Sequence, residues 1–302
     1  MRDMRSFPST KSSSARSLTE ESDTFVGVQT RTPVARPEAM RAVPDPRDVA
    51  RPAFRAWPEI RSRLRAAERW AFFLDFDGTL VNLRNRPGDV RMPAQAGRIL
   101  QRLVTHTNVF VAIVSGRSLK DLRRLVNVNG LHYFGLHGAE RDGKLATLSS
   151  KARAALQSAK RAARLHLGVI RGIWIEDKGL SFSVHHRDAD APAFARADAA
   201  LADLVATWGD ALHILNGSRV WEVLPREIPG KSAAVEDVLR KLPADTAVVY
   251  IGDDGTDEMA FAVLPNQITV RVGREPTTCA RYYVRAPADV LRLLARMEKE
   301  LT

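Results

Sequence analysis

Two aspartates, Asp75 and Asp77, stand two positions apart where an apolar run meets a glycine, in the stretch FLDFDGTL. Side chains alternate along a strand with a period of two, so both carboxylates should project from the same side of the strand end. Carboxylate oxygens suit Mg²⁺, and a carboxylate can attack phosphorus to form an acyl phosphate. A simple Asp-Gly turn would leave the first acid unexplained. The pair therefore predicts that Asp75 attacks phosphorus and that Asp77 acts as general acid and base.

A second acidic cluster follows the apolar run AVVYIG and contains Asp253, Asp254, Asp257 and Glu258. Four acids within six residues repel one another unless a cation neutralises them. The cluster therefore predicts a metal site, with oxygen ligands of the kind that Mg²⁺ prefers. A helix start at Thr256 and Asp257 is the competing interpretation, because Thr-Asp-Glu before an apolar run also resembles a helix cap.

Two further residues have contexts that suit phosphate binding. Ser115 ends the apolar run VFVAIVS, where its hydroxyl and the amides of Gly116 and Arg117 would face an anion. Lys231 follows Gly230 at the expected start of an amphipathic helix, although the positive end of a helix dipole disfavours a lysine. A bound anion would remove that conflict. A plain turn serine and a solvated lysine remain the alternatives.

The elements that would position these residues are short apolar runs that alternate with amphipathic helical stretches from Ala71 onward. Continuous apolar strands separated by helices are typical of a parallel sheet that helices cover on both faces. Ligands of such sheets bind at the carboxyl ends of the strands, which is where the acids, the serine and the glycines fall. The fold class predicted for the core is therefore α/β, with a Rossmann-like parallel sheet sandwiched by helices.

The expected order of helices and strands changes in the middle of the chain, where a helix followed by two strands occurs twice between about Arg141 and Leu224. Tight Lys-Gly and Asn-Gly-Ser turns favour antiparallel hairpins there. We predict a small α+β cap domain at residues 141–224, inserted into a catalytic core formed by residues 56–140 and 225–302. Residues 1–55 are rich in Ser, Pro, Arg and Thr and are expected to form a disordered tail.

The composition of the chain limits the kinds of molecule that it is expected to bind. The net charge of +11 comes from arginines dispersed along the chain, which favours an anionic small molecule. No nucleic-acid partner is expected, because zinc-finger, ribonucleoprotein and basic-zipper patterns are missing from the sequence. No membrane partner is expected, because the apolar runs are far shorter than the roughly 20 residues that span a bilayer. The single cysteine, Cys279, excludes an intrachain disulfide and suits a cytoplasmic location. The oligomeric state is left open, a monomer included.

Four short motifs occur in a fixed order, DFDGT at 75, SGR at 115, GK at 230 and GDDGTDE at 252. In this order and at strand ends, they resemble the haloacid dehalogenase (HAD) superfamily of phosphatases. Three longer stretches, YFGLHGAE at 133–140, IEDKGLSFSVHHR at 175–187 and NGSRVWEVLP at 216–225, resemble the family of trehalose-6-phosphate phosphatases. The resemblance implies an HAD core with an inserted cap of the C2 type, whose helix-strand-strand repeat matches the one expected here.

The resemblance also implies roles for individual residues. Asp75 would be the nucleophile, Asp77 the acid and base, and Ser115 and Lys231 the phosphate ligands. Mg²⁺ would be held by the Asp75 side chain, the Asp77 backbone carbonyl and Asp253, with Asp257 nearby and Arg117 supporting the site. His185 and His186 cannot both face a cleft from one strand. The positions matched to sugar recognition are His137, Gly138 and Glu140 in the core and Glu176, Lys178, His186, Arg187, Asn216 and Glu222 in the cap.

The resulting hypothesis is an enzyme that hydrolyses trehalose 6-phosphate through an aspartyl-phosphate intermediate, with Mg²⁺ as cofactor and a cap that closes over the sugar. Sucrose phosphate or mannosyl-phosphoglycerate would be the alternative substrates within the same superfamily. A non-catalytic module that binds anions is the alternative from another class, and the retained pair of acids argues against it.

Overall fold

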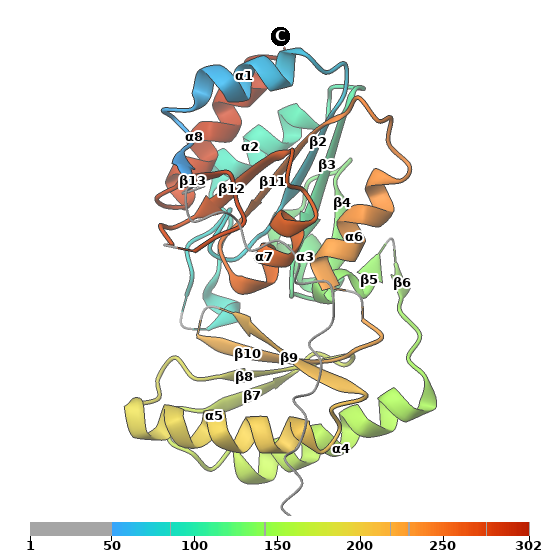
Figure 1. The fold of residues 1–302 in the computed structure, drawn as a ribbon, viewed down its shortest axis with the longest axis vertical. Coiled ribbons are helices and arrows are strands. Elements are labelled where there is room, and N and C mark those ends of the chain that lie inside the picture. The colour runs from blue at the N-terminus through green and yellow to red at the C-terminus, as the bar shows by residue number, and fades with distance from the viewer. Residues whose placement is uncertain are drawn as a thin grey trace, which may run out of the picture. The chain divides into compact units, whose positions relative to one another are not determined.

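The computed structural model describes residues 50–301, except positions 85, 142, 218, 229 and 276 (Figure 1). Most of the predicted tail lies outside the described residues. Its last part, residues 50–55, is described and contains β1 (Arg51–Pro52), which pairs in parallel with β13 (Tyr282–Val284). The larger sheet therefore begins before the boundary that the sequence predicted at residue 56.

The larger sheet of the described chain runs in the order β1-β13-β12-β11-β2-β3-β4-β5-β6. Neighbours from β1 to β4 pair in parallel, and the last two strands add an antiparallel extension. Its other strands are β12 (Ile268–Val272), β11 (Ala247–Gly252), β2 (Trp70–Leu74), β3 (Val109–Val114), β4 (His132–Gly135), β5 (Glu140–Arg141) and β6 (Lys144–Leu145).

Alternate side chains of the central strands point to opposite faces of this sheet. Phe72 and Leu74 pack with α1 (Trp57–Arg65), α2 (Ala94–Leu103), α3 (Leu119–Val126) and α8 (Pro287–Glu298). Ala71 and Phe73 pack on the other face with α6 (Gly230–Leu239) and α7 (Gly255–Ala262). Burial on both faces explains why these strands are apolar throughout. Of two short 3₁₀ turns, η2 (Pro87–Asp89) lies between β2 and α2, and η3 (Leu136–Gly138) directly follows β4.

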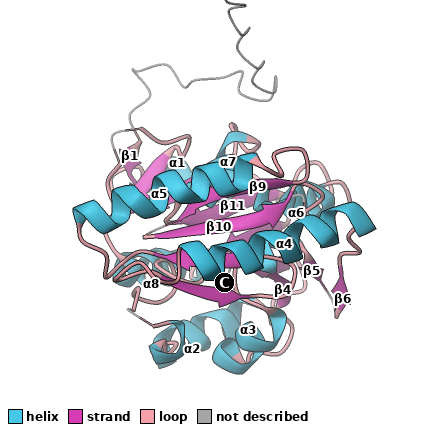
Figure 2. Ribbon diagram, turned by 90° about the horizontal axis from the view of Figure 1, so that it is seen from below, coloured by secondary structure: helices cyan, strands magenta, loops and turns pink. Residues whose placement is uncertain are grey.

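The second sheet is antiparallel and has the order β7-β8-β10-β9. Its strands are β7 (Trp174–Asp177), β8 (Phe182–His185), β10 (Val220–Pro225) and β9 (Leu212–Gly217). Figures 1 and 2 show α4 (Ser150–His166) and α5 (Ala191–Ala206) across one face of this sheet. The prediction of a parallel core with an inserted α+β cap is confirmed. The cap boundary at residue 141 remains a prediction, and β5 and β6 extend the larger sheet on both sides of it.

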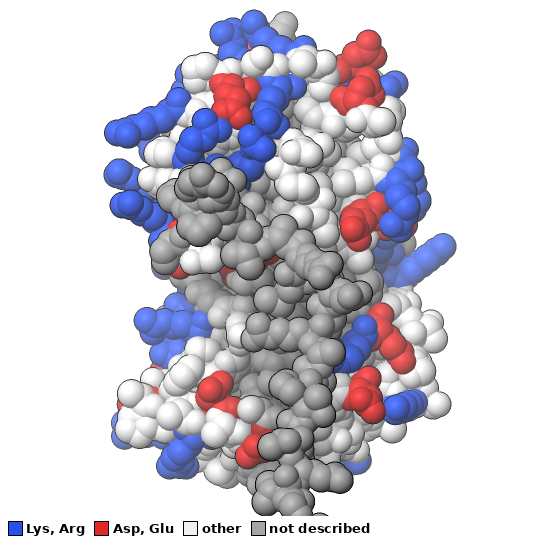
Figure 3. Space-filling view, in the orientation of Figure 1, with Lys and Arg blue, Asp and Glu red and all other residues white. Residues whose placement is uncertain are grey.

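Charged side chains are dispersed over the surface. On the face drawn in Figure 3, Lys and Arg are interspersed with Asp and Glu and do not form one continuous patch. Among the described residues, no helix is long and apolar enough to cross a membrane.

Candidate active site

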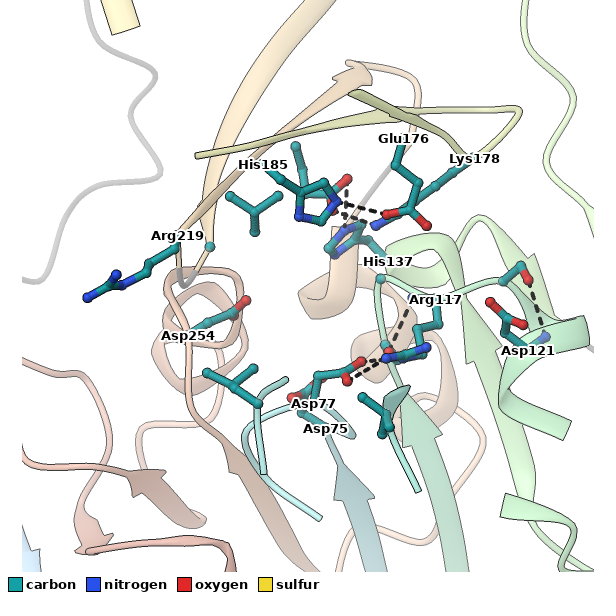
Figure 4. Close-up of a pocket in the computed structure, with 18 of the residues that line it drawn as sticks. Asp75, Asp77, Arg117, Asp121, His137, Glu176, Lys178, His185, Arg219 and Asp254 are labelled. Carbon is teal, nitrogen blue, oxygen red and sulfur yellow. Dashed lines mark hydrogen bonds and ion pairs between the residues drawn. The ribbon is translucent and has the colours of Figure 1, made fainter. Parts of the chain in front are cut away.

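A pocket of about 390 Å³ lies between the carboxyl ends of the core strands and the cap sheet (Figure 4). Its core side is formed by residues that follow β2, β3 and β11, and its cap side by residues of β7, β8 and β10. The predicted residues that line it are Asp75, Asp77, Ser115, Arg117, His137, Glu176, Lys178, Arg187, Glu222, Lys231 and Asp253.

Asp75 directly follows β2, and its backbone N–H donates to the carbonyl of Ile251 at 2.9 Å, which ties it to β11. The Nζ of Lys231 donates to Oδ1 of Asp75 at 2.9 Å, and the two residues are only 4% and 2% exposed. Burial raises the pKa of Asp75 to about 6, although the ammonium of Lys231 acts in the opposite direction. The structure thus brings the predicted nucleophile and the predicted phosphate-binding lysine into contact.

Asp257 organises the floor of the pocket by accepting four hydrogen bonds. Its Oδ1 accepts from Lys231 at 2.8 Å and from the hydroxyl of Tyr250 at 2.7 Å. Its Oδ2 accepts from the backbone N–H groups of Asp253 and Asp254, both at 3.1 Å. Burial raises the pKa of Asp257 to about 8. These four donors fill the lone-pair positions of a carboxylate, so Asp257 is placed to orient Lys231 and the loop after β11.

Carboxylate oxygens of Asp75, Asp253 and Asp257 all lie within 4.8 Å of one another and form a group that could hold a metal ion. Burial, reinforced by the neighbouring Asp75, raises the pKa of Asp253 well above its usual range. Gly78 has a φ of +81°, and a Cβ there would lie 2.1 Å from the carboxylate of Asp253, so only glycine fits. Buried hard oxygen donors with one lysine among them suit a divalent cation such as Mg²⁺.

The other two acids of the second cluster have structural contacts. The side chain of Asp254 accepts from the backbone N–H groups of Thr256 and Asp257 and caps α7. The carboxylate of Glu258 accepts from Arg271 at 2.9 Å and from Thr278 at 2.8 Å, away from the pocket. The sequence prediction of a four-acid metal site is therefore too broad, and the competing interpretation as a helix start is also correct.

Asp77 forms a bidentate ion pair with Arg117. The Nε and a terminal nitrogen of Arg117 donate to the two carboxylate oxygens at 2.5 and 2.8 Å (Figure 4). The backbone N–H of Arg117 donates to the hydroxyl of Ser115 at 3.2 Å, so the turn after β3 holds both residues. The arginine of the SGR motif therefore orients the second aspartate of the DFDGT motif.

His137 lies where the core meets the cap, in a strained turn. Leu136 and His137 have φ values of +47° and +57°, which non-glycine residues rarely adopt. The backbone N–H of His137 donates to the carbonyl of Ser115 at 2.9 Å. Neither ring nitrogen has a hydrogen-bond partner among the described residues, and Nε2 lies 3.9 Å from Oε2 of Glu222, which also has none. Burial lowers the pKa of His137 to about 4, so its ring is neutral near pH 7.

The cap side of the pocket consists of paired charges. Nζ of Lys178 donates to Oε1 of Glu222 at 2.6 Å, and the hydroxyl of Ser183 donates to the same oxygen at 2.8 Å. Burial opposes the charge of Lys178, but the carboxylates of Glu222 and Glu176 outweigh it and raise the pKa of Lys178. Glu222, Ser183 and Glu176 are register partners across β10, β8 and β7, so their side chains share the face toward the core.

His185, the last residue of β8, and His186, which follows it, point to opposite faces of the cap sheet. His185 lines the pocket, bonds to Glu176 at 2.9 Å and stacks on Trp174 with ring centroids 3.6 Å apart. The ring of His186 packs instead against Phe194 and Trp221, beneath α5. The assignment of His186 to the sugar site is therefore replaced by His185.

Three other residues predicted for the sugar site do not line the pocket. Gly138 has a φ of +99°, and a Cβ there would lie 2.9 Å from the Cβ of Ala234, so it allows α6 to approach the turn. Oε2 of Glu140 accepts from the backbone N–H that begins α3. Asn216 is the register partner of Trp221, whose side chain is buried in the cap core, and so it shares that face of the sheet.

Several lining residues were missed by the sequence analysis, which named neither Arg84, Asp121 nor Arg219. The alternation of side chains along a strand would have identified His185 as the pocket residue if the face taken by one of the two histidines had been known. Arg219 has a φ of +61° in the turn between β9 and β10, and its guanidinium points away from the other labelled residues (Figure 4). The Asn-Gly-Ser sequence predicted a turn here but not that Arg219 would line the pocket.

Comparisons with known proteins agree with this geometry. The model of a family described as trehalose-phosphatase matches residues 73–288. A trehalose-phosphate phosphatase of Mycobacterium ulcerans is 32% identical over 250 residues, which cover 78% of this chain and 63% of that protein. A trehalose-phosphate phosphatase of Mycobacterium avium is 36% identical over 200 residues, covering 63% of this chain and 50% of that protein. The chain thus spans less than two thirds of the length of these relatives.

A solved structure supports the fold. The C-terminal domain of the Candida albicans trehalose-6-phosphate phosphatase superposes with a TM-score of 0.71 at 21% identity, covering 83% of this chain and 99% of that one. At that identity the similarity concerns the fold alone, a parallel core with an inserted cap.

Proposed function

The chain belongs to the trehalose-phosphatase family, and from that premise we propose that it hydrolyses trehalose 6-phosphate to trehalose and inorganic phosphate. The observation that carries this proposal is the contact of Lys231 with Asp75 at 2.9 Å on the floor of a pocket whose opposite wall is the polar face of the cap. A nucleophile and its cation face a surface rich in groups that bind hydroxyls. Relatives named as trehalose-phosphate phosphatases support the choice of sugar.

In the first step, a carboxylate oxygen of Asp75 attacks phosphorus and the bond from phosphorus to the sugar oxygen breaks. The leaving oxygen takes a proton from Asp77 and departs as the hydroxyl of trehalose. Lys231 and the hydroxyl and amides at Ser115 bind the phosphoryl oxygens, where charge must be stabilised. Both oxygens of Asp77 accept from Arg117, so we expect one of these bonds to open when the substrate binds.

In the second step, Asp77 accepts a proton from a water molecule, whose oxygen attacks the phosphorus of the aspartyl phosphate. The bond to Asp75 breaks, inorganic phosphate leaves and the carboxylate of Asp75 is restored. Cap residues exclude other water during both steps. The roles of nucleophile and of general acid and base need two carboxylates in different surroundings. Asp75 is buried beside Lys231, whereas Asp77 is held by Arg117 at the pocket wall.

Mg²⁺ fits the floor of the pocket, where we assign its protein ligands to the side chains of Asp75 and Asp253 and to the backbone carbonyl of Asp77. When bound, the ion would neutralise charge on the phosphoryl group and on the carboxylates around it. We assign Asp257 to orientation, because its oxygens already accept from Lys231, Tyr250 and two backbone N–H groups.

The cap wall is our proposed sugar site, with Glu176, Lys178, Glu222, His185 and Arg187 as the residues that meet hydroxyl groups. We include cytoplasmic location in the proposal because a chain with one cysteine, which is free, suits a reducing compartment. The domain division at residues 56–140, 141–224 and 225–302 is likewise part of the proposal, with the core extended back to residue 50 by β1.

A phosphate-release assay with Mg²⁺ tests this function. Trehalose 6-phosphate, sucrose 6-phosphate, mannosyl-phosphoglycerate and glucose 6-phosphate are compared at equal concentrations. We expect kcat/KM for trehalose 6-phosphate to exceed the others by about tenfold or more, since lost hydrogen bonds to a polar site are costly. Equal turnover of all four substrates would contradict the choice of trehalose and leave the general phosphatase activity.

A further inference from the structure

A buried lysine in the cap has contacts that the proposed chemistry does not use. Lys160 belongs to α4, on the side of the cap sheet away from the pocket, and its side chain is only 2% exposed. Lysines are rarely this buried unless their charge is paired. Its Nζ donates to Oδ1 of Asp177 at 2.5 Å and to the carbonyl oxygen of Gly179 at 2.5 Å.

The partners of Lys160 lie where β7 passes into the turn to β8, since Asp177 is the last residue of β7 and Gly179 belongs to the turn. Oδ1 of Asp177 also accepts from the backbone N–H of Gly179 at 2.9 Å, and Oδ2 accepts from Arg164 at 3.0 Å. Gly179 has a φ of +80°, so the turn depends on a left-handed glycine. The ammonium of Lys160 therefore binds the side chain that precedes Lys178 and the carbonyl that follows it.

Lys178, which lies between these two partners, points to the other side of the sheet. Its Nζ donates to Oε1 of Glu222 at 2.6 Å on the wall of the pocket, and its side chain is 13% exposed (Figure 4). A change in the turn would move Nζ of Lys178 away from this carboxylate. A displacement of about 1 Å in a binding group is enough to lower activity strongly.

We propose that Lys160 is a positioning residue for substrate recognition, which holds the β7–β8 turn so that Lys178 and Glu222 present a fixed pair of charges to the sugar. This inference rests on the proposed function, because it assumes that Lys178 and Glu222 bind the sugar part of the substrate. Lys160 itself does not line the pocket. Its effect on the reaction passes through Lys178.

A positioning role and a purely structural role predict different kinetics. Loss of a contact that is equal in the ground state and the transition state raises KM and leaves kcat unchanged. A substrate without a sugar, such as p-nitrophenyl phosphate, reaches the floor of the pocket but has no hydroxyls for Lys178. A structural defect would instead lower the fraction of active protein and reduce turnover of both substrates equally.

The experiment compares wild-type protein with Lys160→Met, which keeps a long side chain and removes the charge. We expect KM for trehalose 6-phosphate to rise about tenfold, with kcat changed less than about twofold. For p-nitrophenyl phosphate we expect kcat/KM to stay within about twofold of wild type. Lys151→Met is the matched control, since Lys151 is an exposed lysine of the same helix, and it should behave as wild type.

Two more variants locate the effect. In Lys178→Met protein, adding Lys160→Met should raise KM no further, because residues that act through one another are not additive. Lys160→Gln removes the charge but keeps a hydrogen-bond donor on a long side chain, and it should show the same rise in KM with a smaller size. It also serves if Lys160→Met does not fold, as judged by thermal unfolding.

Three results would overturn the inference. The first is an unchanged KM for trehalose 6-phosphate in folded Lys160→Met or Lys160→Gln protein. The second is an equal loss on both substrates, and the third is full additivity with Lys178→Met. Failure of the proposed function would look different, because wild-type protein would then release phosphate from p-nitrophenyl phosphate but not from trehalose 6-phosphate, and the inference would fall with it.

Discussion

The floor and the cap wall of the pocket both bury charged groups, but they balance those charges differently. On the floor, carboxylate oxygens of Asp75, Asp254 and Asp257 lie 2.9, 3.8 and 2.8 Å from the ammonium of Lys231, and Asp253 lies beside Asp75 and Asp257, so negative charge is in excess. Burial raises the pKa of Asp75 to about 6 and that of Asp257 to about 8, which is the response of carboxylates that lack enough counter-charge. The excess negative charge on the floor would therefore stabilise a bound cation.

On the cap wall, each carboxylate has a partner. Glu222 pairs with Lys178 at 2.6 Å, and Glu176 pairs with His185 at 2.9 Å. Burial opposes ionisation of Glu222, but the ammonium of Lys178 outweighs it and lowers the pKa of Glu222. The difference supports our proposal that the floor holds a metal ion and the phosphoryl group, and that the cap binds the neutral sugar part of the substrate.

Removing the metal ion from the floor of the pocket should have the largest effect on activity. We expect EDTA to lower kcat/KM by about a thousandfold or more, because a metal contributes several kcal/mol of charge stabilisation and about 1.4 kcal/mol is a factor of ten. Mg²⁺ should also raise the midpoint of thermal unfolding, since it binds carboxylates grouped only in the folded state. Addition of excess Mg²⁺ should restore activity. Full activity in EDTA would contradict the assignment of the floor.

The histidine between floor and cap should make stability depend on pH. Burial lowers the pKa of His137 from 6.5 to about 4, so between these values the unfolded chain binds a proton that the folded protein does not. The contribution of His137 to the free energy of unfolding should therefore fall as pH drops from about 6.5 to about 4, by up to about 3 kcal/mol, whereas the raised pKa values of Asp75 and Asp257 act in the opposite direction. The contribution is measured by urea unfolding as the difference between wild-type protein and His137→Gln, which should change in favour of the variant as pH falls through this range. A difference that does not change with pH would contradict the lowered pKa of His137.

The smallest expected effect distinguishes His185, the last residue of β8, from the neighbouring His186. His185→Asn should lower kcat/KM for trehalose 6-phosphate by about tenfold, because Glu176 loses its partner at the pocket. His186→Asn should leave kcat/KM within about twofold and lower the free energy of unfolding by about 1 kcal/mol, because that ring packs against Phe194 and Trp221. The reverse outcome would restore His186 to the sugar site.

The sequence predicted the parts of the molecule that depend on local pattern. Buried strands are apolar throughout and end in glycine and acid, so the α/β core and the insertion followed from the pattern of the chain. Asp75 and Lys231 were each predicted for the phosphate site from their local context, and the structure adds the contact between them. The beginning of the core was predicted too late. The short strand Arg51–Pro52 has no apolar run to mark it, and it is recognisable only through its pairing with Tyr282 and Tyr283.

The cap wall was predicted less completely, because it depends on which face each strand turns to the core. Alternation excluded His185 and His186 from facing the pocket together but did not decide between them. Asn216 lies on the face of the cap sheet that points away from the pocket, and alternation alone did not show which face it would take. Glu258 lay in a cluster that suggested metal binding, and its contact with Arg271 joins residues distant enough in the chain that pattern alone does not reveal it.

The most direct test of the division between floor and cap is kcat/KM for trehalose 6-phosphate and for p-nitrophenyl phosphate in two variants measured side by side. Asp75→Asn, on the floor, should lose both activities by about four orders of magnitude, as expected for a removed nucleophile. Glu222→Gln, on the cap, should lose about tenfold or more on trehalose 6-phosphate and no more than about threefold on p-nitrophenyl phosphate. Equal losses on both substrates in Glu222→Gln, or substantial turnover by Asp75→Asn, would contradict the account.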